Sequence, residues 1–265
     1  MIPILEIKEK ARTLGVPPST IERDYAQNWL LVYLSEISMA LKGGTGIRKV
    51  YFKDYRFSDD LDFTLIQHYD SEVLKGKIEQ SIINAREDIG IAFKDDISFI
   101  PTRSGHRAVI YFSIIPSSRT SLIKIDLDLT EPENEEILLP VENKPIFHNY
   151  SDKIESNVTA YSLEEIMAEK IRSLFQRVRP RDLYDVSQIA DFIDRSQVKS
   201  ILEQKCRKKE VIIDSEIFRD RKERFRASWD TSLSHQMHAL PDFEGAYNRV
   251  LQEIEYYKKL ELITN

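Results

Sequence analysis

The sequence lacks several features that would point to a secreted or membrane protein. Among its 265 residues only Cys206 is a cysteine, so the chain can form neither an internal disulfide nor a cysteine-based zinc site. No apolar run is long enough to span a membrane, and the first residues carry charge too early for a signal peptide. We therefore expect a cytosolic (cytoplasmic) protein with no membrane partner.

An overall excess of positive charge is also missing. The net charge is −6, which argues against a protein covered with cations for binding nucleic acid. The distribution is uneven, because residues 170–226 contain 16 Lys and Arg against 10 Asp and Glu, or +6, which leaves −12 for the rest. This asymmetry predicts an acidic catalytic half beside a basic half that holds a polyanion, although charged helical surfaces also produce such patterns by chance.

Two adjacent glycines mark the segment around which the chain is organised. They let the backbone approach a ligand closely and turn its N–H groups inward, as loops that hold phosphates do. The residues that follow, 45–52, are compatible with a short helix whose N-terminus faces a phosphate. For its arginine, one turn into this helix, an ordinary surface ion pair is the alternative to a triphosphate contact. The nucleotide-binding residues predicted in this segment are Lys42, Gly43, Gly44, Thr45 and Arg48.

Alternating aspartates predict a metal site on two strands. Asp60 and Asp62 flank one apolar residue in a predicted strand, 60–66, where residues i and i+2 point to the same face. Such paired carboxylates are what a divalent metal requires for phosphoryl chemistry. A second predicted strand, 121–129, would supply a third carboxylate from Asp126, nearer the strand middle, or from Asp128. An exposed strand face with alternating charge is the alternative.

The remaining pattern divides the chain in two. We predict a helix from a capping box at Ser19 and Glu22 to about residue 41, a helix over 70–90, and further strands at 97–100 and 108–115. Residues 131–160 are polar and contain prolines, which is typical of a linker. Beyond them the periodicity is helical, with helices also at 197–209, 216–228 and 242–262. The predicted domains are 1–155 and 156–265.

One lysine interrupts the apolar stripe of the first helix in the second half. A capping box, Ser162 with Glu165, starts this helix, and Lys170 falls in the middle of its apolar face. A lysine there must reach a buried acid, extend to solvent or face a site. In the next helix Asp182 would offset the dipole in the first turn, and Asp185 follows one turn later. Arg181 is one of three arginines at this connection that could bind phosphates.

Together these motifs resemble the AbiEii/AbiGii toxin family, which is related to the mycobacterial MenT toxins of toxin–antitoxin and abortive-infection systems. The resemblance covers about residues 20–190. It implies an α+β fold: a DNA polymerase β-type nucleotidyltransferase core, with a small mixed sheet and helices, followed by a helical C-terminal half that completes the active site. It also implies Mg²⁺-dependent transfer, with Mn²⁺ as the alternative ion, of a nucleoside monophosphate from an NTP to RNA. In characterised relatives the acceptor is the 3′ end of tRNA.

The resemblance also assigns roles to individual residues. Ser58 and Asp60 match the family's Ser/Thr-x-Asp pair, whose hydroxyl is phosphorylated by the antitoxin in some relatives. A cognate antitoxin, of winged-helix or kinase-like type, is the implied partner. A nucleotidyltransferase that acts on a protein or a small molecule is the first alternative, and a non-catalytic GTP- or NTP-binding protein is the second. The predicted catalytic residues are Ser58, Asp60, Lys170 and Asp185; the metal ligands are Asp60, Asp62 and Asp126; secondary candidates are Asp128, Asp182 and Arg181.

Overall fold

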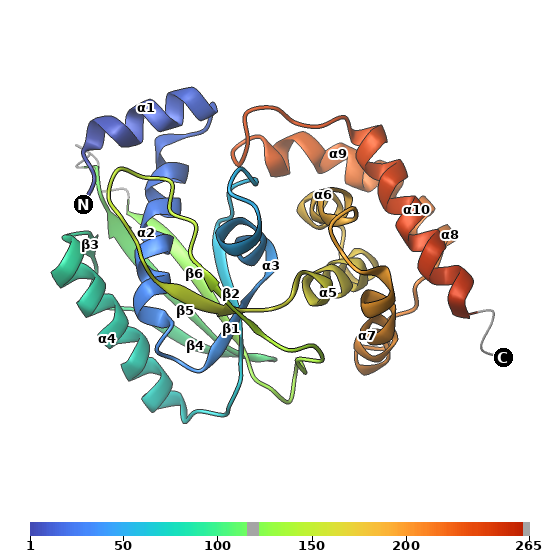
Figure 1. Ribbon diagram of the computed structural model, residues 1–265, viewed down its shortest axis with the longest axis horizontal. Coiled ribbons are helices and arrows are strands. Elements are labelled where there is room, and N and C mark those ends of the chain that lie inside the picture. Colours follow the sequence, from blue (N-terminus) through green and yellow to red (C-terminus); the bar gives the residue numbers. More distant parts are fainter. Residues whose placement is uncertain (116–121, 262–265) are drawn as a thin grey trace. The chain divides into compact units, whose positions relative to one another are not determined.

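The computed structural model describes residues 1–115 and 122–261, with side chains as far as residue 258. The chain divides into two units, Met1–Tyr161 and Ser162–Asn265. The first unit is built on a sheet and the second on helices (Figure 1). A mixed sheet with helices, followed by a helical region, confirms the predicted fold class.

An eight-stranded mixed sheet forms the centre of the first unit, in the order β3-β5-β6-β2-β1-β8-β7, with β4 paired to β5 at the side. The pairs β2–β6 and β1–β8 are parallel and the others are antiparallel. Because β2 lies between β6 and β1, it is a central strand of the sheet. The strands are β1 Met39–Lys42, β2 Asp60–Leu65, β3 Ala92–Phe93, β4 Ser98–Thr102, β5 Gly105–Ser113, β6 Ile123–Thr130, β7 Glu142–Pro145 and β8 Asn157–Ala160.

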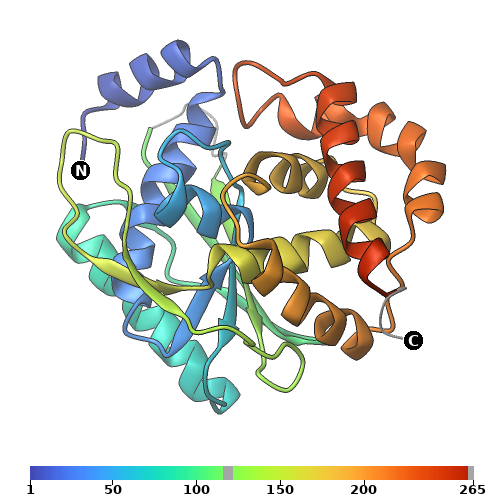
Figure 2. The ribbon, with the colours of Figure 1, turned by 45° about the vertical axis from the view of Figure 1, so that its right-hand side comes forward.

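Helices cover this sheet and supply much of the apolar core. Helix α2 packs against α4, β6 and β8, and α1 packs against α2 (Figures 1 and 2). A short helix, α3, follows β1 and continues as a π-helical turn, η1. The helices of the first unit are α1 Ile4–Leu14, α2 Pro18–Leu34, α3 Gly43–Gly46, η1 Ile47–Tyr51 and α4 Ser71–Ile89. Helix α4 confirms the prediction for 70–90, since the Asp70 side chain accepts hydrogen bonds from the first turn and Gly90 ends it with a φ of 77°.

Two expectations for the first long helix are wrong. The helix ends at Leu34 instead of residue 41, because the four residues of β1 pair with β2. The capping box is absent as well: Pro18 occupies the first helical position, so Ser19 already lies inside the helix. Glu22 instead accepts hydrogen bonds from the backbone N–H groups of Ile114 and Ile115, at 3.2 and 2.9 Å. Tertiary pairing therefore overrides the local signal.

The predicted linker also contains regular structure. Within 131–160 lie β7 and β8, which pair with each other, and β8 extends the sheet by pairing with β1. Their composition is polar because both strands lie toward one edge of the sheet, where one face is exposed. The strands predicted at 97–100, 108–115 and 121–129 correspond to β4, β5 and β6 with shifted ends. Ser121 lies outside the described residues.

The second unit consists of helices around α6. Helix α6 packs against α5, α9 and α10, and α5 also packs against α7. The Ser162 side chain accepts a hydrogen bond from the Glu165 N–H, which confirms the capping prediction. The segment predicted as one helix over 216–228 forms two, separated at Arg221. The helices are α5 Leu163–Gln176, α6 Pro180–Ile189, α7 Arg195–Lys208, α8 Ser215–Asp220, α9 Lys222–Leu233 and α10 Phe243–Glu261.

No helix within the described part of the chain is both long and apolar enough to cross a membrane.

Candidate active site

Four aspartates form an array on two neighbouring strands. The strands β2 and β6 are parallel, and their register places Asp60 beside Asp126 and Asp62 beside Asp128. Register partners lie about 4.8 Å apart, and positions i and i+2 about 6.7 Å apart, on the same face of the sheet. We call this set the aspartate array. The two strands therefore bring together carboxylates that are 66 residues apart in sequence (126 − 60 = 66).

Burial confirms that the array faces away from the core. All four aspartates are half-buried, whereas Leu61 and Phe63 on β2, and Leu127 on β6, are fully buried. The alternation leaves the carboxylates accessible while their strands remain anchored by apolar packing. Carboxylate oxygens on adjacent strand positions are suitable ligands for a hard divalent cation such as Mg²⁺. The donor set of the array thus fits such an ion.

Two exposed cations contact the β6 side of the array. Arg107 on β5 binds Asp128 through two hydrogen bonds, Nε–Oδ1 at 2.6 Å and Nη2–Oδ2 at 3.1 Å. Lys124 binds Asp126 through one contact of 2.7 Å between Nζ and Oδ2. The pKa of Arg107 is raised, chiefly by its hydrogen bond to Asp128 and by the charge of that carboxylate, and further by Asp126 and Asp60. Asp128 accepts two hydrogen bonds from Arg107, whereas Asp126 accepts one from Lys124. Asp126 is therefore the less constrained of the two carboxylates.

The glycine pair lies directly beside this array. Gly43 has a φ of 69°, in the left-handed region, and a Cβ at this position would lie 2.7 Å from Oδ2 of Asp62. A Cβ on Gly44 would lie 2.5 Å from Nη2 of Arg56 and 3.3 Å from Oγ of Ser58. Gly43 therefore requires glycine for its left-handed conformation, and a side chain at Gly44 would displace the end of Arg56. The close approach gathers backbone N–H groups, a cation and a hydroxyl around one loop.

Thr45 and Lys42, both predicted to bind nucleotide, lie next to β2. The Thr45 side chain is fully buried, and its hydroxyl donates to the backbone carbonyl of Asp60, so it fixes the start of β2. In this conformation the Thr45 hydroxyl is therefore used by β2 and does not face a ligand. The Lys42 ammonium lies over the ring of Tyr161, at 5.6 Å from its centroid, and Lys42 pairs in register with Asp62.

Helix α2 holds the turn that precedes β2. Gln27 is fully buried, and its amide donates to the backbone carbonyls of Ser58 and Asp59, at 3.1 and 3.2 Å. Arg23 binds the Asp59 carboxylate at 2.6 Å and also donates to the backbone carbonyl of Lys124, at 3.1 Å. These two side chains connect the start of β2 to the start of β6, so they position both halves of the array.

Arg48, predicted to contact a triphosphate, forms a buried ion pair in this structure. Its Nε binds Asp24 Oδ1 at 2.6 Å, its Nη1 donates to the Tyr55 carbonyl, and the guanidinium stacks on Phe57. Lys49 binds the same carboxylate oxygen at 2.6 Å. Burial acts to raise the pKa of Asp24, but the charges of Arg48 and Lys49 hold that pKa well below its usual range. A buried carboxylate requires cations, and this requirement accounts for Arg48.

In the second unit, Lys170 reaches buried acids. Its ammonium lies 2.8 Å from Oδ1 of Asp182 and 2.7 Å from Oδ2 of Asp185, and its side chain is only 10% exposed. Arg177 also binds Asp182, at 2.9 Å. Burial acts to raise the pKa of Asp182, but Lys170 and Arg177 hold it well below its usual range. Asp182 therefore does more than offset a helix dipole, and Arg181 precedes it, half-buried, in the first turn of α6.

The sequence reasoning missed several side chains of this site. Arg56 lies two residues before Ser58 in the sequence, and this proximity was an available signal. Arg23, Gln27 and Arg107 carried no such signal, because only the pairing of β5 with β6 and the packing of α2 bring them to the array.

A glycine loop beside carboxylates on adjacent strands of a mixed sheet is the arrangement of the nucleotidyltransferase fold. The sequence model of the AbiEii family, the nucleotidyl transferase toxins of type IV toxin–antitoxin systems, matches residues 29–249. The chain therefore belongs to this family. Membership makes the chain a toxin of the transferase class. It also implies a nucleotide substrate and an antitoxin.

Solved structures share the fold at low sequence identity. The MenT4 nucleotidyltransferase toxin of Mycobacterium tuberculosis superimposes with a TM-score of 0.65 at 16% identity, over 97% of this chain and 90% of that one. The protein JHP933 of Helicobacter pylori gives a TM-score of 0.62 at 18% identity, over 94% and 96% of the two chains. Comparison with curated proteins gives no match.

Proposed function

We propose that the chain transfers a nucleoside monophosphate from an NTP to an RNA acceptor, the 3′ end of tRNA. The observation that carries the proposal is the aspartate array beside Gly43 and Gly44. It combines a metal-binding carboxylate set with a loop shaped for phosphates, which are the two requirements of nucleotidyl transfer. The basic segment 170–226 favours a polyanionic acceptor over a protein or a small molecule.

The proposed metal ligands are Asp60, Asp62 and Asp126. Bound there, Mg²⁺, or Mn²⁺ in its place, supplies positive charge to the phosphates and favours ionisation of an attacking hydroxyl. Asp126 is preferred over Asp128 because Arg107 binds Asp128 through both oxygens. Asp126 also orients the acceptor hydroxyl by accepting its hydrogen bond.

Other side chains stabilise and position the nucleotide in this proposal. The backbone N–H groups of Gly43 and Gly44 hold the triphosphate, and Arg56 adds a cation next to them. The Thr45 hydroxyl keeps Asp60 in place by donating a hydrogen bond to its backbone carbonyl. The family resemblance assigns catalytic roles to Lys170 and Asp185, and the proposal retains them; their ion pair is buried, as that of Lys49 with Asp24 is. The protein acts in the cytoplasm, where tRNA and NTPs are available.

Ser58 is the proposed target of a kinase-like antitoxin, with a winged-helix antitoxin as the alternative partner. A phosphate on this hydroxyl would add negative charge next to Gly44 and would repel the triphosphate.

The test is an incubation of the purified protein with Mg²⁺, total tRNA and each labelled NTP in turn. We expect label on tRNA from one NTP, and its loss in Asp60→Asn, because a metal ligand is removed. Asp54→Asn, an exposed aspartate in the preceding loop, is the matched control and should retain activity. Label on a protein or a small molecule instead of RNA would contradict the proposed acceptor. Nucleotide binding without any transfer would contradict the proposed catalytic activity.

A further inference from the structure

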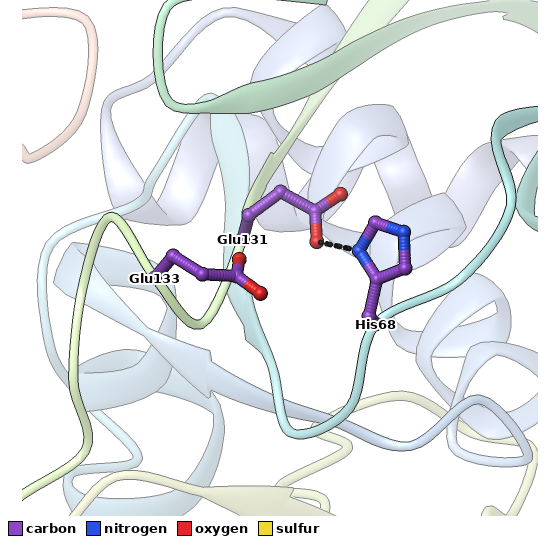
Figure 3. Close-up of side chains that lie close together, drawn as sticks. All are labelled: His68, Glu131 and Glu133. Carbon is purple, nitrogen blue, oxygen red and sulfur yellow. Dashed lines mark hydrogen bonds and ion pairs between the residues drawn. The ribbon is translucent and has the colours of Figure 1, made fainter.

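We infer that the first unit carries a second metal site, for a divalent transition metal such as Zn²⁺, formed by His68, Glu131 and Glu133. This histidine–glutamate cluster lies in the segments that follow β2 and β6 (Figure 3). It is independent of the proposed reaction. None of its members belongs to the aspartate array.

The three side chains converge from two segments. One ligand atom from each residue lies within 4.8 Å of the other two, and Nδ1 of His68 is 3.3 Å from Oε2 of Glu131. In Figure 3 the imidazole and the two carboxylates gather around one point beside the chain. Two neighbouring carboxylates repel each other, and a bound cation would offset that repulsion.

Glu131 provides a second, independent indication of a ligand. The residue is only 8% exposed, and its Oε1 has no hydrogen-bond partner within the described residues. Nδ1 of His106 lies 3.4 Å from this oxygen and also lacks a hydrogen bond there. Leaving a buried carboxylate oxygen without a donor costs free energy that coordination of a cation recovers. Each carboxylate oxygen of Glu131 therefore has a histidine beside it, His68 at Oε2 and His106 at Oε1.

The distances and the donor types favour a transition metal over Mg²⁺. Two ligands that bind Zn²⁺ at about 2.1 Å in a tetrahedral site lie about 3.4 Å apart, close to the observed His68–Glu131 separation. Imidazole nitrogen suits Zn²⁺ and its neighbours in the transition series, whereas Mg²⁺ prefers oxygen ligands. His68 and Glu133 are exposed, so the cluster is accessible and solvent can complete the coordination.

The cluster is remote from the aspartate array along the strands. Glu131 is five residues beyond the proposed ligand Asp126 and three beyond Asp128, which corresponds to roughly 16 and 10 Å of extended strand. An ion here would connect the segment after β2 to the turn after β6, and it would stabilise the folded state in proportion to its occupancy. The two sites can therefore be tested separately.

The experiment is a titration of metal-free protein with Co²⁺, followed by visible absorption, and displacement of Co²⁺ by Zn²⁺. With excess Mg²⁺ present to occupy the aspartate array, we expect Co²⁺ to bind with nitrogen–oxygen ligand-field bands that Zn²⁺ abolishes. Asp60→Asn should retain these bands, because it alters only the array. His68→Ala and Glu133→Gln, both at exposed positions, should weaken binding at least about tenfold.

The matched control is His238→Ala, another exposed histidine, which should bind as the unmodified protein does. Circular dichroism of each variant establishes that it is folded. The proposal is overturned if Co²⁺ gives no such bands, or if folded His68→Ala and Glu133→Gln bind Co²⁺ like the unmodified protein. Either result would leave the His68–Glu131 contact as a hydrogen bond alone.

Discussion

The first unit contains two places where aspartates pair with cations, and the cations differ in exposure. In the Asp24 cluster (Asp24, Arg48 and Lys49) the cationic side chains are 11% and 1% exposed. In the aspartate array, Arg107 and Lys124, which bind Asp128 and Asp126, are 46% and 56% exposed. The same residue type thus carries buried ion pairs in one place and solvent-exposed ion pairs in the other.

The difference separates a structural role from a role in binding. An exposed ion pair contributes little to stability, so its carboxylate can exchange a lysine for a metal ion at small cost. A buried pair cannot, because removing one partner leaves a charge in a medium of low polarity. The Asp24 cluster therefore fixes η1 against α2, whereas Asp126 and Asp128 of the array pair with solvent-exposed cations.

Replacing Asp126 should give the largest effect, a loss of nucleotidyl transfer, and replacing Asp128 should give a much smaller one. We expect Asp126→Asn to lower the initial rate of nucleotidyl transfer at least about a hundredfold, comparable to the loss of one transition-state contact. Asp128→Asn should change it only a few-fold, because that carboxylate is bound to Arg107. The measurement is the rate of label incorporation at saturating NTP. The opposite order of the two variants would place the third ligand at Asp128.

Removing the buried carboxylate of Asp24 should lower stability more than removing a carboxylate from an exposed ion pair. Asp24→Asn leaves Arg48 and Lys49 without their shared anion, and we expect the free energy of unfolding to fall by about 3–5 kcal/mol. Urea denaturation followed by circular dichroism measures this change. Asp95→Asn, which removes an exposed partner of Arg86, serves as the control and should change stability by less than about 1 kcal/mol. Equal effects of the two variants would remove the distinction.

The Asp24 cluster should also make the unfolding free energy depend on pH in the acid range. The pKa of Asp24 is lower in the folded chain than in the unfolded chain, so below its ordinary value, about 3.9, the unfolded state binds the additional proton. Its contribution to stability is therefore present at neutral pH and lost as the pH falls below about 4. We expect Asp24→Asn to flatten the acid limb of the unfolding free energy by up to about 1.4 kcal/mol per pH unit. Parallel acid limbs would contradict the assignment.

The smallest effect should come from the exposed arginine. Arg107→Gln removes both contacts to Asp128, and we expect a change in unfolding free energy of less than about 1 kcal/mol, because the pair is solvent-exposed. The stability of this variant at low and high salt is the measurement. A loss as large as that of Asp24→Asn would show that exposure does not separate the two groups.

Local signals succeeded where a residue's role depends on its immediate neighbours. The alternation of Lys124, Asp126 and Asp128 with apolar residues predicted the exposed face of β6, and Ser162 predicted the start of α5. They failed at Met39–Lys42, which continues a helical pattern but pairs with β2, and in the polar segment that contains β7 and β8. The physical reason is that strand pairing with distant residues outweighs local propensity.

The sequence by itself determined the glycine loop, the aspartates of two strands, the helical second half and the family resemblance, because each depends on spacing within a short segment. Only the tertiary structure decided that Asp60 lies beside Asp126, that Arg48 binds Asp24, and that Lys170 lies between two buried aspartates. It also brought His68 to Glu131. These contacts depend on strand register and on the need of every buried charge for a partner, and neither can be obtained from spacing alone.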